Sequence, residues 1–276
     1  EQALEFVALP HPVKLTDNTN ASVNKKSGEY DYTFVSADKI AIIKYTGSES
    51  TVNIPSKIDG FIVTEISCAF NVMDSLKKVV IPSTVTTISA SFEYDSNLAE
   101  VTIPSSVKTI DANSFYKNTA LKSIVIPSSV TTLDAFQDCT SLTSIKIGDN
   151  ISDISAYAFA ESPVYENQYK KGIVYIGKCL LYCNTEAYKS SKVTVKDGTK
   201  TIANEAFSAN KTNPVKTNKD KTDVLPKSVK YIGEDAFRNN YNIESVNINS
   251  SQNIAPTAFI GTKYYNKNKT YYKGAY

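Results

Sequence analysis

The chain has 276 residues, and its 30 Lys and Arg nearly balance its 28 Asp and Glu, giving a formal net charge of +2. This balance offers no concentrated basic composition, which argues against nucleic acid as a partner. No run of about 20 apolar residues occurs, so we expect no transmembrane segment. The single histidine, His11, cannot build a histidine-based metal site.

Residues 1–30 carry no repeated pattern and are predicted to form an N-terminal arm or linker, because the stretch from Asp17 to Lys26 is polar. Residues 31–70 alternate apolar and polar positions irregularly. An irregular first unit is typical of the cap of a repeat protein, which shields the open edge of its sheet. We therefore expect residues 31–276 to form one solenoid whose cap spans 31–70.

Residues 71–159 repeat a short unit regularly. The unit reads L-x-x-V-x-I-P-x-x-V-x-x-I, followed by a variable turn and a phenylalanine. Its equivalent isoleucines lie 21–23 residues apart at Ile81, Ile103, Ile126 and Ile147. A period of this length is typical of a solenoid, in which each coil buries its apolar face against its neighbours.

Each part of the unit predicts a conformation. The alternating stretch before proline, such as Lys78 to Ile81, predicts a short strand, and stacked coils should join these strands into a parallel sheet. Pro82 should end that strand at a corner, because proline lacks an N–H. The step from Val85 to Ile88 forms a second inward edge, and pairs such as Ala69-Phe70 should occupy short helical turns that bury the phenylalanine.

A small or polar residue follows most phenylalanines by three positions. Stacking would turn these residues into a ladder that satisfies backbone groups, although an ordinary turn preference would also explain them. The residues are Asp95, Asn118, Cys139, Ser162, Asn210 and Asn240.

The repeat is interrupted between Phe159 and Phe207, where 48 residues contain no phenylalanine. Residues 160–190 are predicted to insert a β-hairpin, because two apolar runs flank Gly177, which is the first residue of a two-residue turn. The tyrosines and lysines from Tyr165 to Lys171 are expected to be exposed. Residues 191–276 should resume the coils, carry a polar loop over 211–222, and end in a second cap.

The four cysteines do not form a disulfide framework. Cys68 and Cys139 should lie three coils apart, about 14 Å, which is too far for a disulfide. Cys179 and Cys183 should lie about 13 Å apart along one strand. We expect four buried free thiols.

At this point a family resemblance is visible. The segment from Leu121 to Cys139 matches, nearly position for position, the unit of the BspA-type leucine-rich repeats of bacterial surface proteins. The chain resembles this family over about residues 32–261, departing from it at Gly148, which replaces proline, and in the short turn from Leu133 to Phe136. The resemblance implies a mainly β leucine-rich-repeat solenoid, display outside the cell, binding to host or neighbouring-cell macromolecules, and neither catalytic residues nor cofactors.

Two rows of outward side chains on the predicted sheet are the candidate binding surface. They mix small polar, charged and aliphatic side chains without an aromatic residue, so an ordinary solvated sheet surface explains them as well. One row is Lys78, Glu100, Ser123 and Ser144, and the other is Val80, Thr102, Val125 and Lys146. Tyr264 and Tyr265, in the last cap, are a second candidate, for which packing within the cap is the alternative.

These observations favour a non-catalytic, extracellular or surface-bound bacterial adhesion protein, expected to be a monomer, that contacts a host matrix or surface protein. A carbohydrate-binding module that stacks exposed tyrosines on sugar rings is the second hypothesis. A structural spacer within a larger surface protein is the third. Carboxylate pairs such as Glu234 and Asp235 fall in turns, and no constellation for catalysis is apparent.

Overall fold

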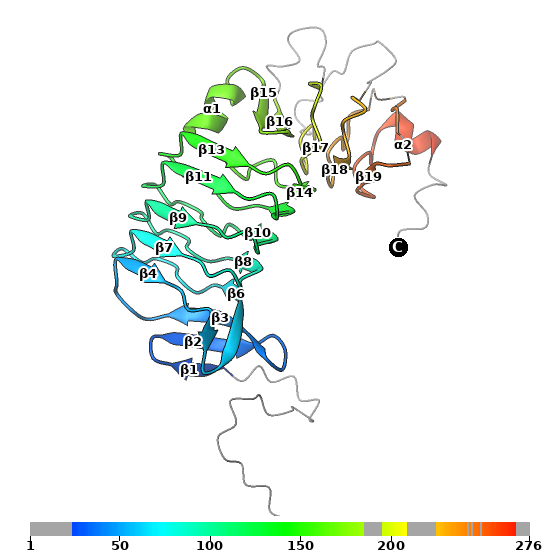
Figure 1. The fold of residues 1–276 in the computed structure, drawn as a ribbon. Coiled ribbons are helices and arrows are strands. Elements are labelled where there is room, and N and C mark those ends of the chain that lie inside the picture. The colour runs from blue at the N-terminus through cyan, green and yellow to red at the C-terminus, as the bar shows by residue number, and fades with distance from the viewer. Residues whose placement is uncertain are drawn as a thin grey trace, which may run out of the picture.

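The computed structural model describes residues 24–184, 195–208, 225–241, 243, 245–248 and 250–268. These residues form a mainly β solenoid whose coils stack into two rows of short strands (Figure 1). The stack rises from β1 to β13 and then bends towards α2, with β8, β10 and β14 on the inner side of the bend. The fold predicted from the repeat is therefore confirmed.

The N-terminal cap is an antiparallel meander that continues into the solenoid. Strand β2 pairs with β1 and β3, and β3 then runs parallel to β6, which β5 joins from its other side. The strands are β1 (Lys25–Ser27), β2 (Tyr30–Phe34), β3 (Lys39–Tyr45), β5 (Lys57–Ile58) and β6 (Phe61–Ser67). Assigning residues up to 30 to an arm was thus wrong for β1, because its backbone pairs in register with β2.

The first row of strands lies before the proline corners and comprises two parallel sheets. One sheet contains β4 (Thr51–Asn53), β7 (Lys78–Val80) and β9 (Glu100–Thr102). The other contains β11 (Ser123–Ile126) and β13 (Ser144–Ile147). The second row follows the corners and continues the cap sheet from β6 through β8 (Thr87–Ser89), β10 (Thr109–Asp111), β12 (Thr132–Leu133) and β14 (Asp153–Ile154).

A column of phenylalanine rings runs through the centre of the stack. The rings of Phe70, Phe92, Phe115, Phe136 and Phe159 are fully buried and nearly parallel, with neighbouring centroids 5.0, 5.2, 5.0 and 5.5 Å apart in that order. Burial of each ring contributes about 1.5–3 kcal/mol, and each stacked pair about 0.5–1.5 kcal/mol more. The column thus contributes to the cohesion of consecutive coils.

The turns that carry these rings are not helical, contrary to the sequence prediction. Two residues after each ring the backbone takes positive φ, as at Val72 (61°) and Lys117 (60°). The left-handed residue directs its N–H to the next coil: that of Lys117 donates to the carbonyl of Gln137 at 3.0 Å. A helical turn would direct this N–H back into its own coil, so hydrogen bonding between coils replaces it.

The polar ladder three residues after the rings links neighbouring coils at Asp95, Asn118, Cys139 and Asn240, whereas Ser162 bonds within its own coil. Cys139 Sγ donates to the carbonyl of Phe115 at 3.2 Å, and the side-chain amide of Asn240 donates to that of Phe207. Asp95 Oδ1 instead accepts the N–H of Met73, at 2.6 Å. Because these side chains are buried, they supply hydrogen bonds that water cannot. Asn210 lies outside the described residues.

The predicted hairpin is present, but it also takes a place in the stack. Strands β15 (Ile173–Ile176) and β16 (Cys179–Cys183) are antiparallel across a turn at Gly177, whose φ is 58°. Strand β16 then pairs in parallel with β17 (Thr201–Ile202), which is followed by β18 (Tyr231–Ile232) and β19 (Asn253–Ile254). The hairpin therefore replaces one coil, and this coil has no phenylalanine turn.

Two short helices, α1 (Pro163–Tyr169) and α2 (Lys263–Lys267), follow the phenylalanine turns at the hairpin and near the last coil. The side chains of Ser162 and Thr262 cap them by accepting the N–H groups of Tyr165 and Tyr265. Helix α1 buries Tyr165, which was wrongly expected to be exposed, while Tyr169, Lys170 and Lys171 are exposed. Tyr165 and Tyr169 lie on the same face of α1, and the ring of Tyr169 stacks on that of Tyr165, with centroids 6.0 Å apart, and helps to cover it.

None of the four cysteines forms a disulfide, but only Cys139, Cys179 and Cys183 are buried. Cys68 is exposed, contrary to the prediction. It lies in a left-handed turn (φ 53°) between the end of β6 and Phe70, where its side chain leaves the core.

Candidate functional site

The two predicted lines of outward side chains lie next to each other on the strands that precede the proline corners. Strand pairing places Lys78 beside Glu100 and Val80 beside Thr102, and likewise joins Ser123 to Ser144 and Val125 to Lys146. We call these eight residues the first-row face. Six of them are exposed, whereas Lys78 and Val80 are half-buried.

The first-row face carries small polar, charged and aliphatic side chains and no aromatic ring. Lys78 Nζ pairs with Glu100 Oε2 at 2.7 Å, with both side chains well exposed to solvent, so the pair contributes little. Val125 is the one large apolar side chain that stands out from this face, with 60% of its surface exposed. The geometry of the rows agrees with the prediction, and their role in binding stays a prediction.

Tyr264 and Tyr265 belong to α2 and are half-buried against the core. The ring of Tyr264 meets Phe259 edge-on, with centroids 5.4 Å apart. This contact covers the last described phenylalanine of the column. Both tyrosines therefore take part in closing the stack.

A cleft that the sequence did not predict lies where the hairpin coil replaces a phenylalanine turn. It has a volume of about 200 Å³ and joins the coils of β14 and β17. We call it the seam cleft; it is lined by Asp134, Ser155, Ala156, Tyr157, Asn204, Glu205, Glu234 and Asp235. The N–H of Asn204 donates to the carbonyl of Ile154 at 2.9 Å, so the two coils meet directly where the missing turn would lie.

The seam cleft concentrates negative charge. Burial raises the pKa of Asp134, which the Ser155 hydroxyl bond partly offsets and the charges of Asp111 and Asp153 reinforce. Burial also raises the pKa of Tyr157, helped by the charge of Glu205. The carboxyl of Asp134 is thus close enough to those of Asp111 and Asp153 to be influenced by their charges.

A cluster of tyrosines adjoins the cleft. Tyr157 and Tyr169 are 44% and 38% exposed, and each lies 5.8 Å from the ring of Tyr182. The buried Tyr165 stacks on Tyr169 at 6.0 Å. Burial raises the pKa of Tyr182 to about 12. The cluster therefore presents aromatic surface beside a polar cleft.

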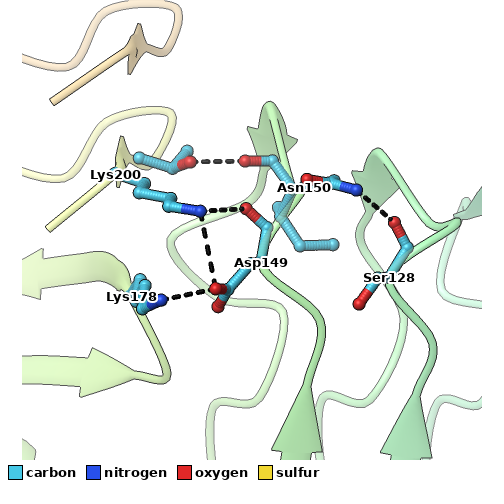
Figure 2. A network of polar contacts seen from close by, with 7 residues as sticks. Ser128, Asp149, Asn150, Lys178 and Lys200 are labelled. Carbon is cyan, nitrogen blue, oxygen red and sulfur yellow. Dashed lines mark hydrogen bonds and ion pairs between the residues drawn. The ribbon is translucent and has the colours of Figure 1, made fainter. Parts of the chain in front are cut away.

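A network of charges ties the hairpin to the coils on either side of it (Figure 2). Asp149 lies between Lys178, at the hairpin turn, and Lys200, before β17, and its carboxylate pairs with both amines. The bond from Lys178 lowers the pKa of Asp149. Asn150 Nδ2 also donates to the carbonyl of Ser128 at 2.9 Å. Gly148 precedes this network, and a Cβ there would come within 2.4 Å of Ser128 Cα, so glycine lets two corners approach closely.

The described part of the chain shows no group of three or more His, Cys, Asp or Glu side chains arranged to hold a metal ion. Neither α1 nor α2 is long and apolar enough to cross a membrane, and no other helix is described. His11 lies outside the described residues.

Sequence comparison agrees with the repeated coils and proline corners. Six copies of the BspA-type leucine-rich repeat region match residues 41–165 and 133–266. The chain belongs to this family. No curated protein matches it.

Solved structures similar to this BspA-type repeat protein include a leucine-rich cell surface protein of Faecalibacterium prausnitzii, with 21% identity, a TM-score of 0.42, and coverage of 84% of this chain and 77% of that one. A leucine-rich repeat protein of T. pallidum has 23% identity and a TM-score of 0.38, with coverage of 80% and 71%. The pneumococcal vaccine antigen PcpA has 16% identity and a TM-score of 0.42, with coverage of 84% and 71%.

The seam cleft left only a weak signal in the sequence of this BspA-type repeat protein. The missing phenylalanine between Phe159 and Phe207 revealed the interruption. That signal could not reveal that Asp134 and Glu234, which are 100 residues apart, line one cleft. Such a juxtaposition depends on how the hairpin replaces a coil.

Proposed function

We propose that this chain is a non-catalytic, extracellular binding region of a bacterial surface protein that contacts macromolecules of a host or a neighbouring cell. Membership of the BspA-type family is the observation that carries the proposal. Stacked coils give such proteins long, exposed surfaces for recognition. The family match indicates no enzyme family.

The first-row face supports a contact of this kind in its centre. Val125 and Thr102 are exposed on short, well-paired strands, so a partner could bury them without rearranging the backbone. Apolar side chains at the centre of an interface contribute most when water is excluded around them.

A capture experiment tests the proposal. The immobilised chain is exposed to matrix and mucus proteins, and a variant carrying Thr102→Glu and Val125→Glu is compared with one carrying Lys57→Glu and Lys77→Glu, two exposed positions outside the face. Capture of a defined protein by the wild-type chain is the expected result. Loss only in the first variant would assign the contact to the first-row face, and failure of the wild-type chain to capture any protein would contradict the proposal.

Glycan binding is the second candidate, favoured by the exposed rings of Tyr157 and Tyr169. Binding to a glycan array that Tyr169→Ala abolishes would support it. Equal array signals from the wild-type chain and this variant would show that Tyr169 does not contribute to glycan binding.

A further inference from the structure

Acidic side chains follow one edge of the second row of strands. They lie one to three residues after the inward-facing residue in the coils of β10, β12, β17 and β18. Figure 1 shows the strands β8, β10 and β14 on the inner side of the bend. We call this surface the acidic edge; it comprises Asp111, Asp134, Glu205, Glu234 and Asp235. It ends in the seam cleft, which four of the five carboxylates line.

The acidic edge has little internal neutralisation. Within the described residues, Asp235 pairs with Arg238 at 2.8 Å, and no other carboxylate of the edge has an ion pair. Asp134 is subject to repulsion from Asp111 and Asp153, and Tyr157 from Glu205. A chain whose net charge is +2 therefore carries a local surface of opposite sign.

Lysines of the same coils lie at the other edge of the second row. Lys108 precedes Asp111 by three residues, and Lys230 precedes Glu234 by four. At about 3.3 Å per strand residue these separations are about 10 Å or more, beyond the screening length of about 8 Å at physiological salt. Lys200 is already engaged with Asp149.

The seam cleft provides an opening beside these carboxylates. Because the hairpin coil lacks a phenylalanine turn, the coils of β14 and β17 leave an opening of about 200 Å³. The exposed ring of Tyr157 borders the opening beside Glu205. An aromatic face next to carboxylates suits the cationic end of a lysine or arginine side chain, which is attracted by both.

We propose that the acidic edge docks a basic protein segment, with a lysine or arginine side chain inserted into the seam cleft between Tyr157, Glu205 and Glu234. This inference rests on the proposed function, because it names the chemistry of a macromolecular partner. Charge complementarity selects the occupant, since nucleic acid and sulfated glycans would be repelled by the same carboxylates. A neutral glycan would gain the aromatic contact alone.

Peptide binding tests the inference. A fluorescent oligolysine peptide is titrated with the whole chain, and anisotropy is measured at low and physiological salt, with an oligoglutamate peptide as the negative probe. The variant E205Q/E234Q removes two charges from the cleft. The control E49Q/D74N removes two exposed charges outside both the acidic edge and the first-row face, so both variants have the same net charge. Circular dichroism confirms that each variant is folded.

We expect salt-sensitive binding of oligolysine that E205Q/E234Q weakens about tenfold, with less than a twofold change in E49Q/D74N. Equal weakening in both variants would show that oligolysine binding depends only on the net charge of the chain, and it would overturn the inference. Absence of oligolysine binding, or binding only to a neutral glycan array in a way that Tyr157→Ala abolishes, would overturn it too. Capture of a partner protein that E205Q/E234Q leaves unchanged would retain the proposed function and refute the docking site.

Discussion

The buried carboxyl of Asp95 makes the stability of the chain depend on pH. Asp95 is fully buried, its Oδ1 accepts the N–H of Met73 at 2.6 Å, and its Oδ2 has no hydrogen-bond partner. Burial, opposed by the Met73 bond and reinforced by Asp74, raises its pKa from 3.8 to about 7. A protonated Asp95 would also carry the O–H donor that matches the side-chain donors of Cys139 and Asn240 in the same ladder.

The sign of the effect follows from proton binding. Between pH 4 and pH 7 the folded chain keeps a proton that the unfolded chain releases, so stability falls as pH rises and is lowest above about pH 7. Each pH unit over this interval corresponds to about 1.4 kcal/mol, which gives an upper limit of about 4 kcal/mol. Because an amide keeps the acceptor for Met73 and supplies a donor, Asp95→Asn should raise the free energy of unfolding by about 2–4 kcal/mol at pH 8 and by less than about 1 kcal/mol at pH 4.

Urea unfolding followed by far-ultraviolet circular dichroism measures this difference, since the chain has no tryptophan. Asn118→Asp, one coil further, should add a second loss of stability as pH rises, because Asn118 is equally buried. Asp74→Asn, at an exposed neighbour, is the control for charge alone. An Asp95→Asn variant that loses stability between pH 4 and pH 8 as steeply as the wild-type chain would refute the reasoning.

Two further substitutions test other contacts. Val72 is 67% exposed and β-branched, yet its φ is 61°, so Val72→Asn should stabilise the chain by about 1 kcal/mol while keeping the N–H bond to Glu93; a lower urea midpoint would contradict this. Asp149→Asn should lower the melting temperature at low salt, and this difference should shrink at high salt and as pH falls below 3.8, because lysine pairing lowers the pKa of Asp149. A difference in melting temperature that is independent of both salt and pH would show that the charges are not the cause.

The coils could be predicted from sequence because each one repeats the same local rule. Proline directly follows the predicted strand, and each phenylalanine from Phe70 to Phe136 lies six residues before the next leucine. Buried residues such as Ile88 and Phe115 occupy the predicted inward positions. The left-handed residue after each phenylalanine was not predicted, because valine and tyrosine there disfavour positive φ. Its conformation follows from the hydrogen bond to the next coil.

The seam could not be predicted in the same way. Periodicity located the hairpin, but not the parallel pairing of Cys179 with Thr201 that places β16 in the stack. The burial of Tyr165 and the grouping of Asp134 with Glu234 depend on that placement. The positions of residues inside the repeat were therefore predictable, whereas the contacts formed where the repeat is interrupted required the structure.

The break in the phenylalanine column has a consequence for cooperativity. Among the described rings, Phe136–Phe159 and Phe207–Phe237 are stacked pairs, and no ring contact joins Phe159 to Phe207. In a linear array each unit is coupled only to its neighbours. At this junction hydrogen bonds and the Asp149 ion pairs replace ring stacking, so we expect the two blocks to separate there first. A pulling force or rising temperature should therefore release the shorter C-terminal block while the N-terminal coils remain folded.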